Sequence, residues 1–161
     1  MDTNKRFPIL FEEKMETPFG DFLIQADEIG ICTAALIKIP EHFLPRPNPT
    51  TTQAVQELKE YFEGRRKEFT VPIHPHGTDF QLRVWEAARN IPYGKTISYG
   101  ELAAWAGNPK AARGVGQALN RNPILIITPC HRIIGKNGSL TGFGAGIAMK
   151  AALLALEQVR C

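Results

Sequence analysis

The stretch most suited to chemistry is "TPCHRIIG", in which Cys130 lies between Pro129 and His131. A thiolate is a strong nucleophile, and a base near the thiol lowers the barrier to forming it. Because side chains of adjacent residues generally diverge, a contact relayed through a water or arranged by a bend is more natural than a direct one. A Cys-His pair alone is more often a small buried hydrophobic residue beside an ordinary histidine.

A carboxylate near the end of the chain could complete a triad. Glu157 lies in "GIAMKAALLALEQVR", a predicted helix that is apolar on nearly every face, with leucines three and four positions earlier. Burying a charge is costly unless it is paired, so Glu157 needs a partner. His131 is the leading candidate among the four histidines, which would make Cys130 the nucleophile, His131 the base and Glu157 the orienting group. The alternative is an exposed Glu157 at a fraying helix end.

The segment before Cys130 would hold the thiol rigidly. Residues 124–127 are apolar and lie between Asn122-Pro123 and Pro129. This pattern predicts a buried extended segment whose ends are fixed by the two prolines. The backbone would then set the direction of the Cys130 side chain.

Residues 98–123 predict two short helices joined by a tight turn, which is the outline of a helix-turn-helix. Ser98 and Glu101 have the spacing of a capping box that starts the first helix, and Gly107 ends it. Asn108-Pro109 is expected to cap and begin the second helix.

The second of these helices would present a basic face of low profile. Its inward positions are Ala112, Val115 and Leu119, and its outward positions are Lys110, Arg113, Gly116 and Gln117. Small residues at 111, 114 and 116 would let the backbone approach a partner closely, which suits a narrow groove. A packed helical hairpin with a solvated arginine fits the pattern equally well.

The first half of the chain has a different pattern. Residues 15–38 contain short apolar stretches broken by turn signals, which predicts two or three antiparallel strands. Residues 51–64 predict an amphipathic helix with Val55, Leu58 and Phe62 on one face. Residues 68–73 are a strand candidate, and residues 74–79 are the linker into the second half. The expected domains are therefore 1–75 and 76–161.

Charge divides the chain in the same way. Residues 1–75 hold nine Lys or Arg and twelve Asp or Glu, a net charge of −3, whereas residues 76–161 hold ten and four, a net charge of +6. A basic domain attracts nucleic acid through its phosphates, although a solvated basic face is about as common.

Composition excludes several classes of protein. With 161 residues, of which 43% are hydrophobic and 22% charged, the chain can bury roughly 70% of its unfolded surface. It shows no signal peptide and no apolar run near the ~20 residues of a membrane span, so we expect a cytoplasmic protein without a membrane partner. Its three cysteines include no C-x-x-C, so neither a disulfide framework nor a zinc cluster is expected, and Cys32 and Cys161 receive no role.

The ordered set of motifs resembles a known family. "ITPCHRIIG", preceded by "ISYGELAAWAGNPKAARGVGQALNRNP" and followed by "NGSLTGFGAG" and "LLALE", is similar to the O6-alkylguanine-DNA alkyltransferases, also called methylated-DNA-protein-cysteine methyltransferases. The resemblance runs from about Phe80 to Glu157. It implies an α/β fold, with a small N-terminal antiparallel sheet and helix (ribonuclease H-like) before a mainly helical C-terminal domain that carries a helix-turn-helix (winged-helix-like).

The resemblance also implies an activity. Such a protein repairs DNA by direct reversal. It flips O6-alkylguanine out of double-stranded DNA and transfers the alkyl group irreversibly to its own cysteine. We expect it to act on O4-alkylthymine as well. It would bind the minor groove without strong sequence specificity, act once per molecule as a monomer, and need no metal or other cofactor. The alternative is a lesion-binding repair protein without chemistry, although such relatives have the cysteine replaced.

Roles at the reacting centre follow from the resemblance position by position. Cys130 is implied to be the acceptor, His131 the base acting through a water, and Glu157 the residue that orients the imidazole. Asn122 is implied to fix the turn before the active-site segment.

Further residues are implied to handle the DNA. Arg113 resembles the arginine finger that replaces the rotated nucleotide, and Tyr99 the tyrosine that helps rotate it and donates a hydrogen bond to guanine. The implied DNA-contacting residues are Tyr99, Lys110, Ala111, Ala112, Arg113, Gly114 and Gln117.

The implied alkyl pocket is lined by Pro129, Ile133, Phe143, Gly144 and Ala145, under a loop formed by residues 139–146. The backbone at Cys130 and Ile133 would accept from the exocyclic amine of guanine. Two positions depart from the family pattern, because Phe143 stands where tyrosine is frequent and Ala145 where glycine is usual. The extra methyl group of Ala145 is expected to reduce tolerance of bulky alkyl groups.

Overall fold

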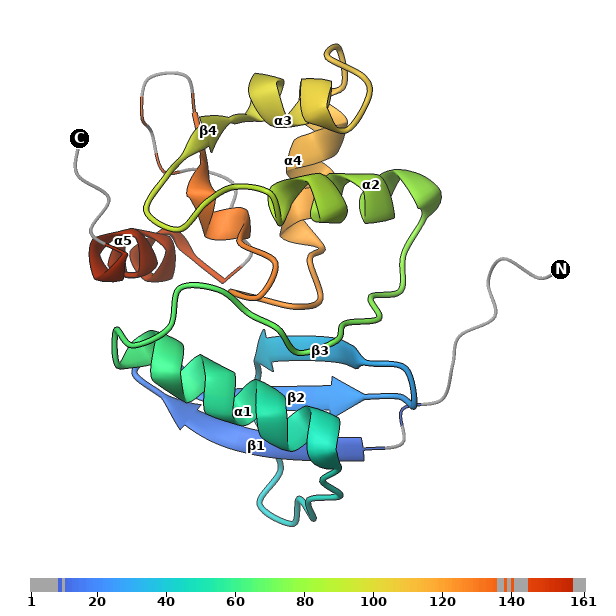
Figure 1. Ribbon diagram of the computed structural model, residues 1–161, viewed down its shortest axis with the longest axis vertical. Helices are drawn as coiled ribbons and strands as arrows, with labels where there is room; N and C mark the ends of the chain where they lie inside the picture. The colour runs from blue at the N-terminus through green and yellow to red at the C-terminus, as the bar shows by residue number, and fades with distance from the viewer. Residues whose placement is uncertain (1–8, 10, 136–137, 139, 141–144, 158–161) are drawn as a thin grey trace, which may run out of the picture. The chain divides into compact units, whose positions relative to one another are not determined.

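The computed structural model describes residues 9, 11–135, 138, 140 and 145–157, and the chain separates into two compact units, Met1–His76 and Gly77–Cys161. The architecture is α/β, with a small antiparallel sheet in the first unit and mainly helices in the second (Figure 1). Among the described residues, no helix combines the length and the apolar character needed to cross a bilayer.

The first unit consists of a meander of strands and one helix. Strands β1 (Phe11–Thr17), β2 (Gly20–Ala26) and β3 (Ile31–Leu36) pair antiparallel in chain order, and α1 (Pro49–Phe62) packs against them (Figure 1). Alternate residues of the central strand, Phe22, Ile24 and Ala26, are fully buried, as the two-residue period of a strand requires. The strands expected in residues 15–38 are confirmed, and the first of them begins at Phe11.

Helix α1 buries a stripe that is rotated from the predicted one. Leu58 is fully buried, but Val55 and Phe62 are only half-buried. The other buried residues of the helix are Thr51, Ala54, Glu57 and Tyr61. The rotation brings a carboxylate, that of Glu57, to the inner side of the helix.

That carboxylate explains why the expected strand at residues 68–73 does not form. Glu57 Oε1 accepts the backbone N–H groups of Thr70 at 2.9 Å and Val71 at 3.1 Å, so these groups do not join a ladder. Pro72 has no N–H to offer. The segment keeps one isolated bridge, between Ile73 and Ile31, which fastens it to the edge of β3.

The second unit is built from short helices. Its helices are α2 (Asp79–Ala88), α3 (Tyr99–Trp105), α4 (Ala112–Asn120) and α5 (Ile147–Leu156), and a 3-10 turn covers Cys130–Arg132. Helix α4 packs against α2 and α3, and the Trp85 indole donates to the carbonyl of Ala118 at 2.8 Å. Strands β4 (Ile97–Ser98) and β5 (Ile133–Ile134) pair in parallel; at two residues each they are too short for a period to reveal them.

The helix-turn-helix differs from the prediction at both helix starts. Ser98 caps α3 by accepting the N–H of Glu101 at 3.1 Å, but the Glu101 carboxylate faces the Ser98 hydroxyl, so the box is half formed. The prediction that Asn108-Pro109 begins the second helix is wrong. The Asn108 side chain accepts the N–H of Lys110 at 3.1 Å, which makes a local turn, and α4 begins only at Ala112.

Residues 124–127 are buried, but the segment is not extended throughout. Leu125 and Thr128 form a bridge across a turn, within which Ile126 has a φ of 71°. This left-handed conformation is rare for a β-branched residue and is kept only where surrounding contacts enforce it. The chain therefore folds back immediately before Cys130.

Candidate active site

The thiol of Cys130 is held by a folded loop. Cys130 is the first residue of the 3-10 turn, its N–H donates to the Thr128 carbonyl at 2.8 Å, and the residue is 3% exposed. Asn122 spans the same loop, because its amide nitrogen donates to the Thr128 carbonyl at 3.0 Å and its oxygen accepts the N–H of Ile124 at 3.0 Å. One buried side chain thus connects the end of the α4 segment to the residues that carry the thiol.

The sulfur of Cys130 is a thiol at neutral pH. Burial raises the pKa of Cys130 to about 12, and a hydrogen bond from the Asn122 side chain and the charge of Lys150 oppose that increase only partly. A protonated, buried thiol is a poor nucleophile. Any reaction at Cys130 therefore requires that a base remove the proton inside a closed site.

His131, Glu157 and Arg132 form a buried network. His131 Nε2 lies 2.6 Å from Glu157 Oε2, and Arg132 donates to both carboxylate oxygens, from Nε at 2.8 Å and from Nη2 at 3.1 Å. The N–H of Gly94 adds a fourth bond to the carboxylate at 3.1 Å, and Arg132 Nη1 donates to the Ile91 carbonyl at 2.7 Å. The network fixes the plane of the imidazole from the end of α5.

The imidazole of His131 is neutral. Burial lowers the pKa of His131 and outweighs the opposing effect of Glu157, while the nearby charges of Arg132 and Lys150 lower it further. Because Nε2 faces a carboxylate, Nε2 carries the hydrogen and Nδ1 is the basic nitrogen. Within the described part of the chain, Nδ1 is buried and has no hydrogen-bond partner. It is therefore available to accept a proton.

Sequence reasoning missed two cations at this site. Arg132 has the carboxylate contacts given above, and Lys150 is 1% exposed, donates from Nζ to the Ile133 carbonyl and lies 6.0 Å from the centre of the Tyr99 ring. Burial lowers the pKa of Lys150 to about 8, against the effect of Cys130. A single lysine inside the otherwise apolar helix α5 was the signal that could have revealed it.

The face of α4 expected to contact DNA is partly exposed. Arg113, Gln117 and the preceding Lys110 are exposed, whereas Ala111, Ala112 and Gly114 are half-buried. A Cβ at Gly114 would lie 3.3 Å from the Phe80 ring, so packing against α2 explains this glycine without any partner. Tyr99 is half-buried at the first position of α3.

Three of the five residues expected to line the alkyl pocket are among the described residues. Pro129 and Ile133 are buried beside Cys130, with Ile133 paired to Ile97 across β4 and β5, and Ala145 is half-buried. Phe143 and Gly144 lie outside the described residues, as does most of the loop at residues 139–146.

Comparison with known proteins gives the same family for both units. The family model of the 6-O-methylguanine DNA methyltransferase ribonuclease-like domain matches residues 10–75, and that of the DNA binding domain matches residues 79–159. A methylated-DNA--protein-cysteine methyltransferase of Methanosarcina acetivorans is 45% identical over 148 residues, covering 88% of this chain and 94% of the relative. A constitutive one of Bacillus subtilis is 42% identical over 156 residues, covering 89% of this chain and 93% of the relative.

Solved structures similar to this chain give the same family. The Mycobacterium tuberculosis O6-methylguanine methyltransferase has a TM-score of 0.81 at 41% identity, and the match covers 94% of each chain. The Mycobacterium tuberculosis OGT in complex with DNA has a TM-score of 0.82 at 43% identity, covering 91% of this chain and 92% of that one. The expected fold, a ribonuclease-like unit before a helical DNA-binding unit, is confirmed.

Proposed function

The chain belongs to the 6-O-methylguanine DNA methyltransferase family, and from that premise we propose that it repairs DNA by moving the alkyl group of O6-alkylguanine onto its own Cys130. The observation that carries the proposal is the buried pair His131–Glu157. Glu157 holds Nε2 of the neutral imidazole, so that the buried Nδ1 is left as the basic nitrogen, and His131 directly follows Cys130 in the sequence. This arrangement supplies a base where the resting thiol needs one.

The proposed alkyl transfer needs no reactant other than the protein and the alkylated DNA. His131 Nδ1 takes the thiol proton through a water, and Glu157 and Arg132 hold the imidazole while it is charged. The sulfur attacks the alkyl carbon, the bond from that carbon to O6 breaks, and its electron pair stays on guanine. N1 of guanine then takes up one proton, which balances the proton that the thiol released. Because the resulting thioether is not readily hydrolysed, each molecule acts once.

Two side chains are suited to the charges that develop. Lys150 lies close enough to Cys130 for its charge to favour the thiolate, which supports a role in stabilising the nucleophile. Tyr99, by its resemblance to the family's tyrosine, would donate to guanine and stabilise the leaving group. Both effects are larger in the transition state than in the resting site, where the thiol is neutral.

For DNA engagement, we propose that α4 enters the minor groove and that Arg113 fills the space left by the flipped nucleotide. A base inside a stack cannot be reached, and extruding it costs a few kcal/mol, which a mispaired, alkylated base reduces. The exposure of Arg113 on a helix of small residues supports this role. Action as a monomer, activity on O4-alkylthymine and the cytoplasmic location remain predictions from the sequence.

A lesion-binding protein without chemistry is the weaker candidate. The chain has Cys130 at the position where such proteins lack the cysteine, and the relatives compared above are named as cysteine methyltransferases. The two functions differ in a titration of the protein with a duplex that contains one O6-methylguanine. Transfer predicts one restored guanine per chain and then no further repair, whereas tight binding with every lesion unchanged would identify a recognition protein.

Replacing Arg113 by alanine should slow transfer from duplex DNA by about 10- to 100-fold, because the extruded nucleotide would no longer be replaced. Arg121→Ala is the matched control, since it removes an exposed arginine one residue beyond the same helix. Single-turnover rates on the lesion duplex measure both variants. Equal slowing in the two variants would mean that Arg113 contributes only charge.

The pH dependence of transfer should report the neutral imidazole. Burial lowers the pKa of His131, so its basic form persists at more acidic pH than that of an ordinary histidine, whose pKa is about 6.5. The single-turnover rate should therefore fall to half its maximum only below about pH 6.5. Duplex binding measured at each pH is the control. A rate that falls to half its maximum at about pH 7 or above would contradict a neutral buried base.

A further inference from the structure

We propose that the hydroxyl of Thr128 positions the water through which His131 takes the proton of Cys130. The inference rests on the proposed function, because it concerns the same proton transfer. It adds to the site a residue that lies two positions before the nucleophile. Thr128 acts through the water and touches neither the alkyl group nor the guanine, so it is a positioning residue.

Two buried polar atoms near the nucleophile lack hydrogen-bond partners. Within the part of the chain that the structure describes, Thr128 Oγ1 and His131 Nδ1 are the buried side-chain oxygen and nitrogen atoms without a partner. Thr128 is 1% exposed and His131 is fully buried. Because an unpaired buried polar group is unfavourable, such groups almost always have a protein or a water partner. Both atoms therefore need one, and they belong to the same four-residue segment.

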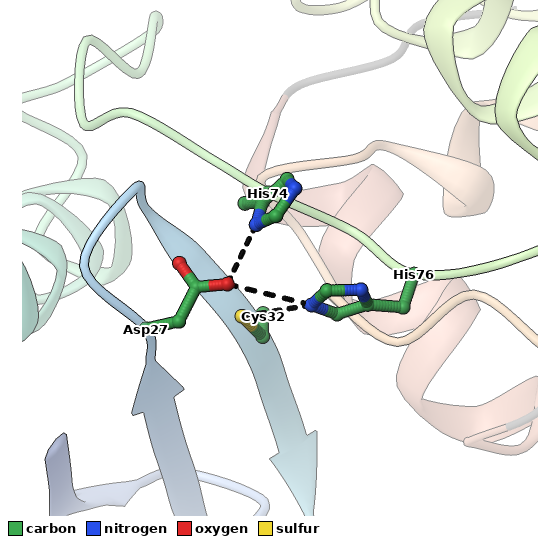
Figure 2. Close-up of side chains that lie close together, drawn as sticks. All are labelled: Asp27, Cys32, His74 and His76. Atoms are coloured by element: carbon green, nitrogen blue, oxygen red, sulfur yellow. Dashed lines mark hydrogen bonds and ion pairs between the residues drawn. The ribbon is translucent and has the colours of Figure 1, made fainter. Parts of the chain in front are cut away.

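Buried polar groups elsewhere in the described residues are paired. In the first unit, the carboxylate of Asp27 accepts two backbone N–H groups and faces both His74 and His76 (Figure 2). The sulfur of Cys32 lies 3.5 Å from Nε2 of His76 in the same cluster. The two unpaired atoms near the nucleophile are exceptions to this pattern.

Packing alone does not explain a threonine at position 128. The four residues before it, 124–127, are isoleucine or leucine, and all are buried. The backbone of Thr128 makes the structural contacts, because its carbonyl accepts from the N–H of Cys130 at 2.8 Å and from the Asn122 amide at 3.0 Å. Valine has nearly the same shape and would fill the same space. The hydroxyl therefore requires a separate reason.

The fold of the segment holds these groups close to the thiol. Pro129 has a φ of −82° and a ψ of 64°, which is the conformation of an inverse γ-turn, and the Cys130 N–H closes this turn on the Thr128 carbonyl. In His131, Nδ1 lies on the backbone side of the ring, whereas Nε2 reaches Glu157. Because the hydroxyl, the thiol and Nδ1 belong to four consecutive residues of a closed turn, one water can bridge them.

Each polar atom has a defined place in this proton transfer. The Thr128 hydroxyl donates to one lone pair of the water, the water donates to His131 Nδ1, and the second lone pair faces the Cys130 thiol. When the sulfur attacks the alkyl carbon, the thiol proton passes to the water and the water gives a proton to Nδ1. The water is regenerated and the hydroxyl is unchanged. The hydroxyl thus fixes the water and polarises it toward donation.

The test compares Thr128→Val, which removes the hydroxyl, with Thr128→Ser, which keeps it. Single-turnover transfer from the O6-methylguanine duplex should slow by about 10- to 100-fold in the valine variant and by less than about 3-fold in the serine variant. Both should bind the duplex as the unchanged chain does, because the hydroxyl is buried. Thr33→Val, at a half-buried position of β3 in the first unit, is the control and should transfer at the unchanged rate.

Stability should follow the opposite order in the two variants. Valine brings no polar atom that needs a partner, so the midpoint of thermal unfolding should stay the same or rise. Serine lacks a buried methyl group, so its midpoint should fall by roughly 2–4 °C. A threonine with only a structural role would make the more stable variant at least as fast as the other. Equal transfer rates in Thr128→Val and the unchanged chain would therefore overturn the proposal.

A high-resolution crystal structure tests the same contact without measuring transfer. We expect one ordered water within about 2.6–3.2 Å of both Thr128 Oγ1 and His131 Nδ1, and its loss or displacement in Thr128→Val. The absence of a water shared by these two atoms would contradict the proposal. Normal transfer by the unchanged chain and by Thr128→Val rejects this inference alone, whereas no transfer by the unchanged chain rejects the proposed function.

Discussion

Replacing Cys130 by serine should abolish alkyl transfer, by on the order of 10⁴-fold or more, while binding to the lesion duplex persists. A hydroxyl is a far weaker nucleophile than a thiol at neutral pH, and the site offers no second group at the end of the same rigid loop. Serine is close to cysteine in size, so the buried position between Thr128 and His131 accommodates it. Single-turnover transfer and equilibrium binding on the same duplex measure the two effects separately.

Cys161→Ser is the matched control for this experiment. It removes another thiol of the chain, at a position outside the described residues to which the sequence assigns no role. The control should transfer at the unchanged rate. Residual transfer by Cys130→Ser at a rate near that of the control would place the acceptor elsewhere in the chain.

Replacing Glu157 by glutamine should destabilise the second unit and also slow transfer. The change removes the charge that opposes Arg132, and a buried cation left without its partner costs about 3–5 kcal/mol of unfolding free energy. Glutamine keeps only one acceptor oxygen, which cannot serve both Arg132 and His131, so the tautomer of the imidazole is no longer fixed and the transfer rate should fall by at least about 100-fold. Urea unfolding measures the first effect, and single-turnover rates well below the unfolding temperature measure the second.

Glu86→Gln is the control for Glu157→Gln, because Glu86 is an exposed carboxylate on α2. It should change the unfolding free energy by no more than about 0.5 kcal/mol and should leave the transfer rate unchanged. If Glu157→Gln were as stable and as fast as this control, the buried network would have neither the structural nor the catalytic importance argued here.

The sequence predicted the elements whose signal is local. Short apolar stretches broken by turn signals revealed strands within residues 15–38, although not the start of β1 at Phe11, and terminal glycines marked the ends of α1 and α3. It failed where a side chain satisfied the backbone in place of regular structure. Glu57 binds the N–H groups of the expected strand at residues 68–73, and Asn108 makes a turn where a helix start was expected.

The candidate site likewise contains residues that the sequence predicted and residues that it did not. A carboxylate in an apolar helix needed a partner, and the structure places Glu157 against His131. The roles of Arg132 and Lys150 depend on contacts that join α5 to the segment around Cys130 across more than 15 residues, and no local pattern encodes them. The turn at Ile126, which sets the direction of the Cys130 side chain, requires a left-handed conformation that isoleucine disfavours.

The most direct test of the central claim is the intact mass of the chain after incubation with a duplex that contains one O6-methylguanine, followed by peptide mapping. We predict the addition of one methyl group per chain, located on Cys130, with no further increase at excess duplex and no addition in Cys130→Ala. An unchanged mass with the lesion intact, or a methyl group on any other residue, would contradict the account.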